Sequence, residues 1–266
     1  MKLGLLQIRI EAGDRSGNLD RTRKAIREAV DRNADLLVLP ELWNVGYFDF
    51  DAYGTRAEGL DGPTLSQIGD LAAEYGVSIL AGSIVEDLEE TDVATPAPTG
   101  LSNTSVLFDP AGTRQLVYRK HHLFGYESAE SELLTPGDRL ETASVGGFTV
   151  GVTTCYDLRF PGLYRELVDR GVTLVLVPSA WPYPRIEHWT TLTRARAIEN
   201  QFFVAAVNGA GQAGGPGLIG RSRIIDPWGT VVRAMGADPE TATVSIEPET
   251  VSAVRDRFPA LEDRRS

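Results

Sequence analysis

Two unbroken apolar runs constrain the fold of this chain more than any other feature. Residues 36–39 and 174–177 contain only Leu and Val, and each run is followed directly by a proline, Pro40 or Pro178. Strands without polar alternation are typical of parallel sheets, because such sheets are covered on both faces. Proline cannot continue the hydrogen-bonded ladder, so it favours an end to each strand. The runs therefore predict buried parallel strands in an α/β fold.

The segments around the first run alternate between strand and helix. This alternation builds a covered, largely parallel sheet. In chain order, the expected elements are a strand over 2–10, a helix capped by Asn18 and running to about residue 32, the strand at 36–39, a helix from Pro63 to a stop at Gly76, and a strand over 77–85.

The rest of the chain continues the pattern without a domain boundary. Residues 86–102 are acidic and then rich in Thr, Pro and Gly, which predicts a surface loop, and strands resume directly after it. We therefore expect one domain over residues 1–266. The remaining expected elements are hairpins around 109–112 and 226–229, strands over 148–154, 172–177, 202–207 and 243–246, and helices starting at 161 and covering 189–200.

Composition excludes several classes of protein. The chain has 266 residues, is 42% apolar and carries a formal net charge of -11, which allows a sizeable core and argues against nucleic-acid or anionic-membrane partners. No apolar run approaches the length of a membrane span. The first ten residues read as a strand and not as a signal peptide. A single cysteine rules out an internal disulfide and fits a reducing compartment, so we expect a cytoplasmic protein.

That single cysteine lies at a position suited to chemistry. Apolar residues occupy every second position from Phe148 to Val152, and Pro161 opens a helical pattern after Cys155. Cys155 is therefore expected at the carboxyl end of a strand, on a turn that leads to a helix. In open α/β folds, ligands bind at that edge.

Two further groups with chemical potential, Glu41 and Lys120, follow other predicted strands. Lys120 shares the alternating face of Leu116 and Tyr118, so it points where the apolar residues point. A thiol needs a base to become a strong nucleophile, and an ammonium can stabilise an oxyanion. Each residue also has an ordinary interpretation, a buried apolar cysteine or a solvated charge. Together they favour acyl transfer through a thioester.

Several motifs around these residues resemble one known family. Residues 39–43 (Leu-Pro-Glu-Leu-Trp), 118–124 (Tyr-Arg-Lys-His-His-Leu-Phe) and 155–161 (Cys-Tyr-Asp-Leu-Arg-Phe-Pro) look like the Glu, Lys and Cys motifs of the nitrilase superfamily of carbon–nitrogen hydrolases. His188-Trp189, residues 194–200 and the turn at 226–229 are also similar to it. The resemblance covers nearly the whole chain.

The resemblance implies a fold and a set of roles. The fold would be an α/β architecture, a four-layer α-β-β-α sandwich. Proteins of this family commonly pair into homodimers or form larger assemblies. Glu41 would be the general base, Cys155 the nucleophile, and Lys120 with the backbone N–H of Tyr156 would hold the oxyanion. The family often adds a second glutamate, which could be Glu127, Glu130 or Glu132. The spacing to residues 135–138 favours Glu130.

The resemblance also indicates a substrate class. Cys155-Tyr156-Asp157 points to amides, and Trp181-Pro182 with Arg185 is similar to bacterial omega-amidases, which hydrolyse the terminal amide of 2-oxo acids. Arg185 would bind the substrate carboxylate, with Trp181 and Tyr47 as further substrate contacts; the alternative for Arg185 is a surface arginine. Amidases for N-carbamoyl amino acids and for deaminated glutathione share the same motifs. A catalytically dead binding module on the same fold is the alternative from another class.

Other chemical signals in the sequence are weak. Residues 209–214 match G-x-G-x-x-G, but Gly215-Pro216-Gly217 follows and cannot start the helix that a dinucleotide site needs. No Cys/His cluster with metal-ligand spacing is present, so we expect no metal and no cofactor. Asn103-Thr104-Ser105 fits the glycosylation sequon, which has no consequence without a secretory signal. The expected partner is a small amide substrate, and the Arg-rich tail over 255–265 is a candidate contact with a second subunit.

Overall fold

The two apolar runs form the central parallel strands of two separate sheets in the computed structural model, which describes residues 1–126 and 128–265. β3 (Leu36–Val38) lies parallel between β1 (Lys2–Gln7) and β4 (Ser78–Leu80). β10 (Leu174–Ser179) lies parallel between β9 (Phe148–Val152) and β11 (Phe203–Asn208). Every residue of β3 and β10 is buried.

Antiparallel strands extend both sheets and a small third sheet joins them at one end. The first sheet runs β16-β1-β3-β4-β6-β5, with β7 paired to β6, and the second runs β15-β14-β11-β10-β9-β8. The strands not yet given are β5 (Ile84–Asp87), β6 (Leu101–Phe108), β7 (Arg114–Arg119), β16 (Glu240–Ser245), β8 (Thr142–Val145), β14 (Arg223–Ile225), β15 (Val231–Ala234), and the third sheet's β2 (Arg9–Glu11), β12 (Ala210–Gln212) and β13 (Gly217–Ile219).

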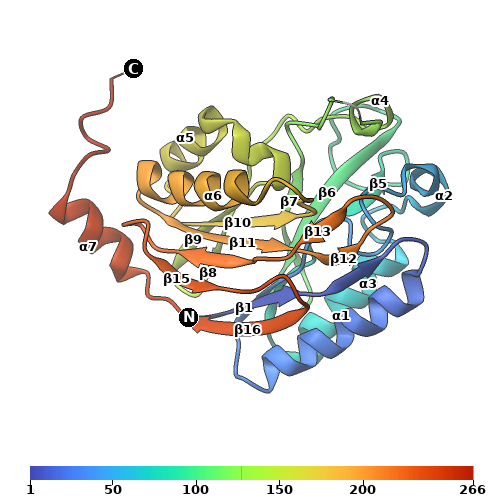
Figure 1. Ribbon diagram of the computed structural model, residues 1–266, viewed down its shortest axis with the longest axis horizontal. Coiled ribbons are helices and arrows are strands. Elements are labelled where there is room, and N and C mark those ends of the chain that lie inside the picture. The colour runs from blue at the N-terminus through green and yellow to red at the C-terminus, as the bar shows by residue number, and fades with distance from the viewer. Residues whose placement is uncertain (127, 266) are drawn as a thin grey trace.

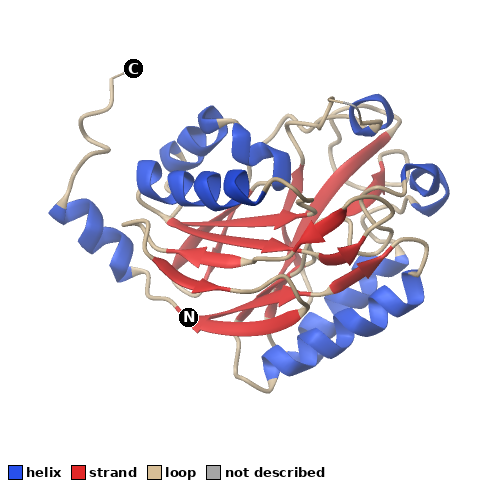
Figure 2. Cartoon of the chain, viewed as in Figure 1, coloured by secondary structure: helices blue, strands red, loops and turns tan. Residues whose placement is uncertain are grey.

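Helices cover the outer faces of the two sheets, as Figures 1 and 2 show. On the first sheet lie α1 (Arg15–Val30) and α3 (Pro63–Tyr75), and on the second lie α5 (Pro161–Asp169) and α6 (Ile186–Asn200). The result is the predicted α-β-β-α sandwich. The shorter helices are α2 (Tyr53–Arg56), α4 (Glu130–Leu133) and α7 (Glu249–Arg257).

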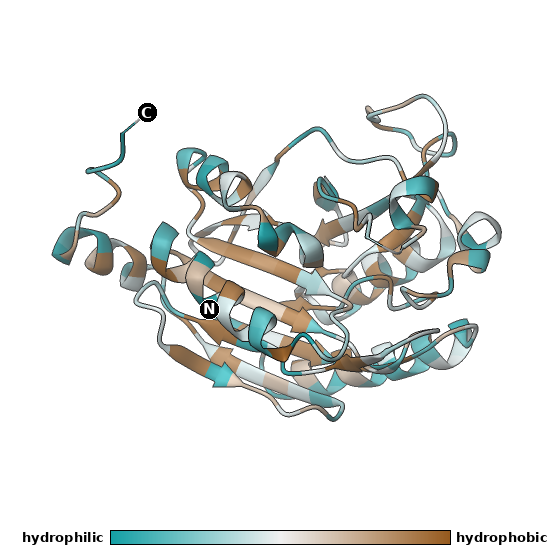
Figure 3. Cartoon of the chain, turned by 45° about the horizontal axis from the view of Figure 1, so that its top comes forward, coloured by the Kyte–Doolittle hydropathy of each residue, from teal (hydrophilic) through white to brown (hydrophobic). Residues whose placement is uncertain are grey.

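Side-chain alternation divides the core between two sides of the first sheet. Leu36 and Val38 pack in a cluster shared with the second sheet, whereas Leu37 packs under the helices with Ile26 and Ile68. In Figure 3 the interior strands are largely brown, while teal residues lie on the helices. None of the described helices combines the length and apolarity needed to cross a bilayer.

Several local predictions differ from the structure. The strand expected over 2–10 is two strands, β1 and β2, which belong to different sheets, and Pro178 does not end its strand, because β10 continues to Ser179. Asn18 does not cap α1: the helix begins at Arg15, Asp14 accepts the capping hydrogen bond from the Gly17 N–H, and buried Asn18 instead bonds Glu11. The strand expected over 77–85 is two strands, β4 and β5. Between them Gly82 has a φ of 67°, and a Cβ there would lie 2.0 Å from the Pro40 oxygen.

Helix α6 begins at Ile186 and not at residue 189. The Trp189 N–H donates to the Arg185 carbonyl over 3.1 Å, which adds a first turn before the predicted start. The other expected helices and hairpins are present, with ends that differ by a few residues.

Candidate active site

Three strands bring Glu41, Lys120 and Cys155 together at one edge of the sandwich. Glu41 follows β3, Lys120 follows β7 and Cys155 follows β9. The Lys120 Nζ lies 2.9 Å from Glu41 Oε1, and both side chains lie close enough to Cys155 to affect the pKa of its thiol. Neither charged side chain is exposed, and Cys155 is 8% exposed. The first sheet therefore supplies Glu41 and Lys120, and the second supplies Cys155.

Glu130 completes the cluster from α4. Its Oε1 lies 2.7 Å from Lys120 Nζ, while its Oε2 accepts hydrogen bonds from the Tyr47 hydroxyl and the Phe124 backbone N–H. Of the three acids considered from the sequence, Glu130 is buried in this cluster and Glu132 is exposed. Glu127 lies outside the described residues.

The turn that carries Cys155 has a strained backbone held by a capping box. Cys155 has a φ of 46°, in the left-handed region that non-glycine residues rarely adopt. It starts a short 3₁₀ helix, Cys155–Arg159, in which Thr154 and Asp157 cap each other reciprocally. Within the described chain the backbone N–H of Tyr156 has no hydrogen-bond acceptor. That donor therefore remains available beside the sulfur.

Asp157 ties the turn to the strand of the lysine. Its buried carboxylate accepts hydrogen bonds from the Thr154 N–H, from the Tyr118 hydroxyl at 2.6 Å, and from both the backbone N–H and the Nδ1 of His122. Tyr118 lies two residues before Lys120 on the same face of β7. Asp157 thus couples the position of the nucleophile to that of the lysine.

Burial and charge set the protonation of the cluster. Burial raises the pKa of the Cys155 thiol well above its ordinary value, and Glu41 adds to this effect while Lys120 opposes it. Burial also raises the pKa of Glu41, with Lys120 opposing and Glu130 adding. Burial would lower the pKa of Lys120, but Glu130 and Glu41 outweigh it and raise that pKa. At neutral pH the resting site therefore holds a thiol and an ammonium.

Comparison with known proteins decides the family. The carbon–nitrogen hydrolase family model matches residues 2–256. This chain belongs to the carbon–nitrogen hydrolases. It is a hydrolase that acts on non-peptide carbon–nitrogen bonds, within the nitrilase superfamily and its amidases, and it acts on small amides.

Relatives of this carbon–nitrogen hydrolase include two bacterial 2-oxoglutaramate amidases. The one from Paenarthrobacter nicotinovorans is 37% identical over 88% of this chain and 79% of its own length. The one from Bacillus subtilis is 34% identical over 99% of this chain and 97% of its own. Among solved structures, XC1258 from Xanthomonas campestris, a CN-hydrolase superfamily protein with an arsenic adduct in its active site, superposes with a TM-score of 0.89 at 32% identity, covering 100% of this chain and 97% of its own.

Cys155 of this hydrolase lines a cavity in which half of the lining residues are aromatic. Two arginines also line it: the Arg185 guanidinium is 5.5 Å from the Phe124 ring, and that of Arg159 is 5.3 Å from the Trp181 ring. The complete lining is Tyr47, Phe48, Phe124, Cys155, Tyr156, Arg159, Ala180, Trp181, Pro182 and Arg185. The predicted substrate contacts Tyr47, Trp181 and Arg185 thus all line the same cavity as the thiol.

Sequence reasoning missed two residues of this site, Arg159 and Asn103. Arg159 lies four residues after Cys155, inside the cysteine motif. This closeness in sequence to the nucleophile could have indicated that its side chain reaches the cavity. Asn103 lies on β6, and its amide donates to both Glu41 and Glu130. The signal for Asn103 was weaker, because it depends on the register between β6 and β7.

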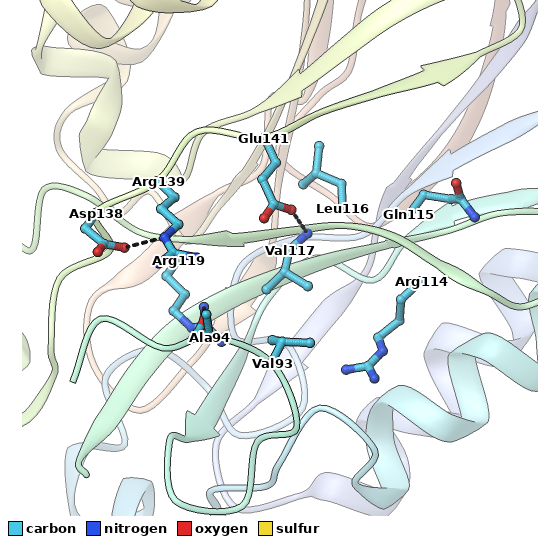
Figure 4. Close-up of a pocket in the computed structure, with 10 residues that line it drawn as sticks. All are labelled: Val93, Ala94, Arg114, Gln115, Leu116, Val117, Arg119, Asp138, Arg139 and Glu141. Atoms are coloured by element: carbon cyan, nitrogen blue, oxygen red, sulfur yellow. Dashed lines mark hydrogen bonds and ion pairs between the residues drawn. The ribbon is translucent and has the colours of Figure 1, made fainter. Parts of the chain in front are cut away.

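A larger cavity elsewhere has no comparable chemistry. It has a volume of about 350 Å³ and lies against β7 and the segment 138–141 (Figure 4). Its buried Arg119 is paired with Glu86, and its Arg114 with Asp92. With those cations already neutralised and no nucleophile in the lining, this cavity is not a second reaction site.

The glycine-rich signal at residues 209–214 carries no site. The glycine-rich segment forms β12 and β13, so no helix begins there to receive a pyrophosphate. Within residues 1–126 and 128–265, no group of three or more His, Cys, Asp or Glu side chains is arranged to hold a metal ion.

Proposed function

We propose that this hydrolase cleaves the terminal amide of a small 2-oxo acid, converting 2-oxoglutaramate and water to 2-oxoglutarate and ammonia. One observation carries the proposal: a thiol, a carboxylate and an ammonium converge beside a cavity that two arginines line. The names of the two bacterial relatives agree with it. The family is established, and the substrate is what we propose.

In the first half of the reaction, Cys155 attacks the amide carbon. Because its thiol is protonated at rest, Glu41 takes the proton as the S–C bond forms. The carbonyl oxygen becomes an oxyanion, which the Tyr156 backbone N–H and the Lys120 ammonium stabilise. Glu41 then returns the proton to the nitrogen, the C–N bond breaks, ammonia leaves, and a thioester remains.

In the second half, water cleaves the thioester. Glu41 takes a proton from the water as its oxygen attacks the thioester carbon, and the same two donors hold the second oxyanion. Breakage of the C–S bond releases the carboxylic acid, and the proton on Glu41 returns to the sulfur. Glu130 holds Lys120 in place through both halves, since it contacts Nζ with both of its oxygens.

The two arginines supply the preference for an acid. Arg185 binds the substrate carboxylate, as the sequence suggested, and Arg159, which lines the same cavity, shares it. The aromatic lining, which includes Tyr47 and Trp181, encloses the carbon chain between the two ends of the substrate.

Ammonia release from a panel of substrates tests this function. The panel holds 2-oxoglutaramate, 2-oxosuccinamate, deaminated glutathione, N-carbamoyl amino acids and simple nitriles. We expect the highest kcat/KM for 2-oxoglutaramate, no effect of a chelator, and no activity in Cys155→Ala. A clear preference for an N-carbamoyl amino acid or deaminated glutathione would replace the proposed substrate, and activity that persists in Cys155→Ala would overturn the thioester mechanism.

We further propose a homodimer in a reducing, cytoplasmic compartment, built as one domain over residues 1–266. Three exposed apolar side chains, Trp228, Phe258 and Ile198, lie near each other on the surface. The rings of Trp228 and Phe258 stack with their centroids 6.1 Å apart, and Ile198 of α6 packs against the turn at 226–229. Such an exposed apolar patch is typical of an interface between subunits. Light scattering tests the dimer: a monomer at micromolar concentration would contradict it.

A further inference from the structure

Asn103 lies inside the charged cluster although it carries no charge. Its side chain is fully buried on β6, and its Nδ2 donates to Glu41 Oε1 over 2.8 Å and to Glu130 Oε1 over 3.3 Å. The opposite orientation of the amide would turn its oxygen toward two carboxylates, so the contacts fix which atom is the donor. One NH₂ group is therefore shared by both acids.

The backbone of Asn103 also positions the lysine. Its carbonyl accepts the Lys120 backbone N–H over 2.9 Å, one step beyond the pairing of Thr104 with Arg119. Lys120 Nζ then reaches the same two carboxylate oxygens that the Asn103 amide contacts. A single residue thus contacts the carboxylates of Glu41 and Glu130 through its side chain and the backbone of Lys120 through its carbonyl. The glycosylation sequon that it begins is buried and cannot accept a glycan in the folded chain.

The charge balance explains why a neutral donor is useful here. Glu41 and Glu130 share the single ammonium of Lys120, and burial together with the neighbouring carboxylate raises the pKa of Glu41. A hydrogen bond from an amide stabilises the ionised carboxylate without adding a charge. The amide has a cost, because the Asn103 Oδ1 is buried and has no hydrogen-bond partner among the described residues. A leucine of similar size would avoid that cost.

We propose that Asn103 is a positioning residue for the hydrolytic reaction, whose side-chain NH₂ keeps Glu41 ionised and directed at Cys155 while holding Glu130 beside Lys120. The inference rests on the proposed function through one assumption, that Glu41 is the general base. Its consequence is specific. Without the amide donor Glu41 binds its proton more tightly, so the base is lost at a higher pH.

Asn103→Leu and Asn103→Ser test this role. We expect the acidic limb of kcat/KM for 2-oxoglutaramate to move up by about one pH unit or more in Asn103→Leu, as losing one hydrogen bond to an ionised group predicts. Asn103→Ser keeps a hydroxyl donor and should shift less. The matched control is Asn200→Leu, because Asn200 is also buried with an unpartnered Oδ1 but donates to the Arg196 carbonyl on α6.

Infrared titration separates failure of this role from failure of the proposed function. The C=O band of protonated Glu41, assigned by its loss in Glu41→Gln, is followed against pH without any substrate. The band should appear at higher pH in Asn103→Leu than in the unaltered enzyme, whichever amide is the true substrate. An unchanged midpoint in both Asn103 variants, or an equal shift in Asn200→Leu, would overturn the inference. If Asn103→Leu does not fold, Asn103→Ser alone decides by the same criterion.

Discussion

The carboxylate of Glu41 and the ammonium of Lys120 lie 2.9 Å apart although their sequence numbers differ by 79, and neither is exposed to solvent. A buried pair of this kind contributes little net stability, because desolvation offsets the attraction. Its value lies in placing a base and a cation beside one sulfur. Removing only one of the two charges nevertheless destabilises the fold, because the other charge is left buried without a partner.

Lys120→Met should therefore reduce both stability and turnover. The substitution leaves Glu41 and Glu130 buried without their shared cation, and losing one partner of a buried pair costs about 3–5 kcal/mol. We expect a lower free energy of unfolding by urea denaturation and loss of ammonia release. Lys24→Met, at an exposed pair on α1, is the control and should leave both unchanged. A Lys120→Met protein as stable as the unaltered enzyme would contradict the burial of this cluster.

The pH dependence of kcat/KM follows from two raised pKa values. Burial raises the pKa of Glu41 above its ordinary 4.5, and the base is lost when Glu41 is protonated, so activity should fall on the acidic side with a midpoint above 4.5. Burial raises the pKa of the Cys155 thiol well above 9.0, so its ionisation should cause no change below that pH. Initial rates of ammonia release across pH check both limits, with recovery of activity at neutral pH excluding denaturation. An acidic midpoint below 4.5 would rule out Glu41 as the base.

Arg185→Ala and Arg159→Ala should weaken recognition of the substrate's acid end. Loss of a charge-assisted hydrogen bond predicts a fall of about tenfold to a hundredfold in kcat/KM for 2-oxoglutaramate, mainly through KM. An amide without a carboxylate, such as butyramide, should lose much less. Arg194→Ala, on the exposed face of α6 outside the cavity, is the control. An unchanged KM for 2-oxoglutaramate in Arg185→Ala would show that Arg185 does not bind the carboxylate.

Much of this arrangement could be predicted from the sequence because apolar periodicity locates the ends of strands. Glu41, Lys120 and Cys155 each lie within three residues of the end of a strand, so placing the strands also placed these groups at one edge. The fold class followed from the two unbroken apolar runs and from the family motifs. Local patterns were therefore sufficient wherever position along one element decided the outcome.

The features that were missed depend on contacts between distant segments. The break at Gly82 is imposed by the Pro40 carbonyl on a neighbouring connection, and no local pattern records that contact. The cap of α1 is Asp14 because Asn18 is engaged with Glu11. Asn103 reaches Glu41 only through the register of β6 with its neighbours. Such contacts become visible only when the elements are assembled.

Glu130→Gln compared with Glu132→Gln tests which acid completes the site. The two residues lie two positions apart on α4, but Glu130 is buried with both oxygens on Lys120 Nζ, whereas Glu132 is exposed. Glutamine keeps the size of the side chain and removes its charge, so Lys120 loses one of its two anchors and the cavity keeps its shape. We expect kcat to fall by about a hundredfold or more in Glu130→Gln, which is the range for a misplaced catalytic group. KM should change little in this variant. Glu132→Gln should change neither kcat nor KM. Equal activity of the two variants in steady-state ammonia release would show that the second acid does not support the lysine.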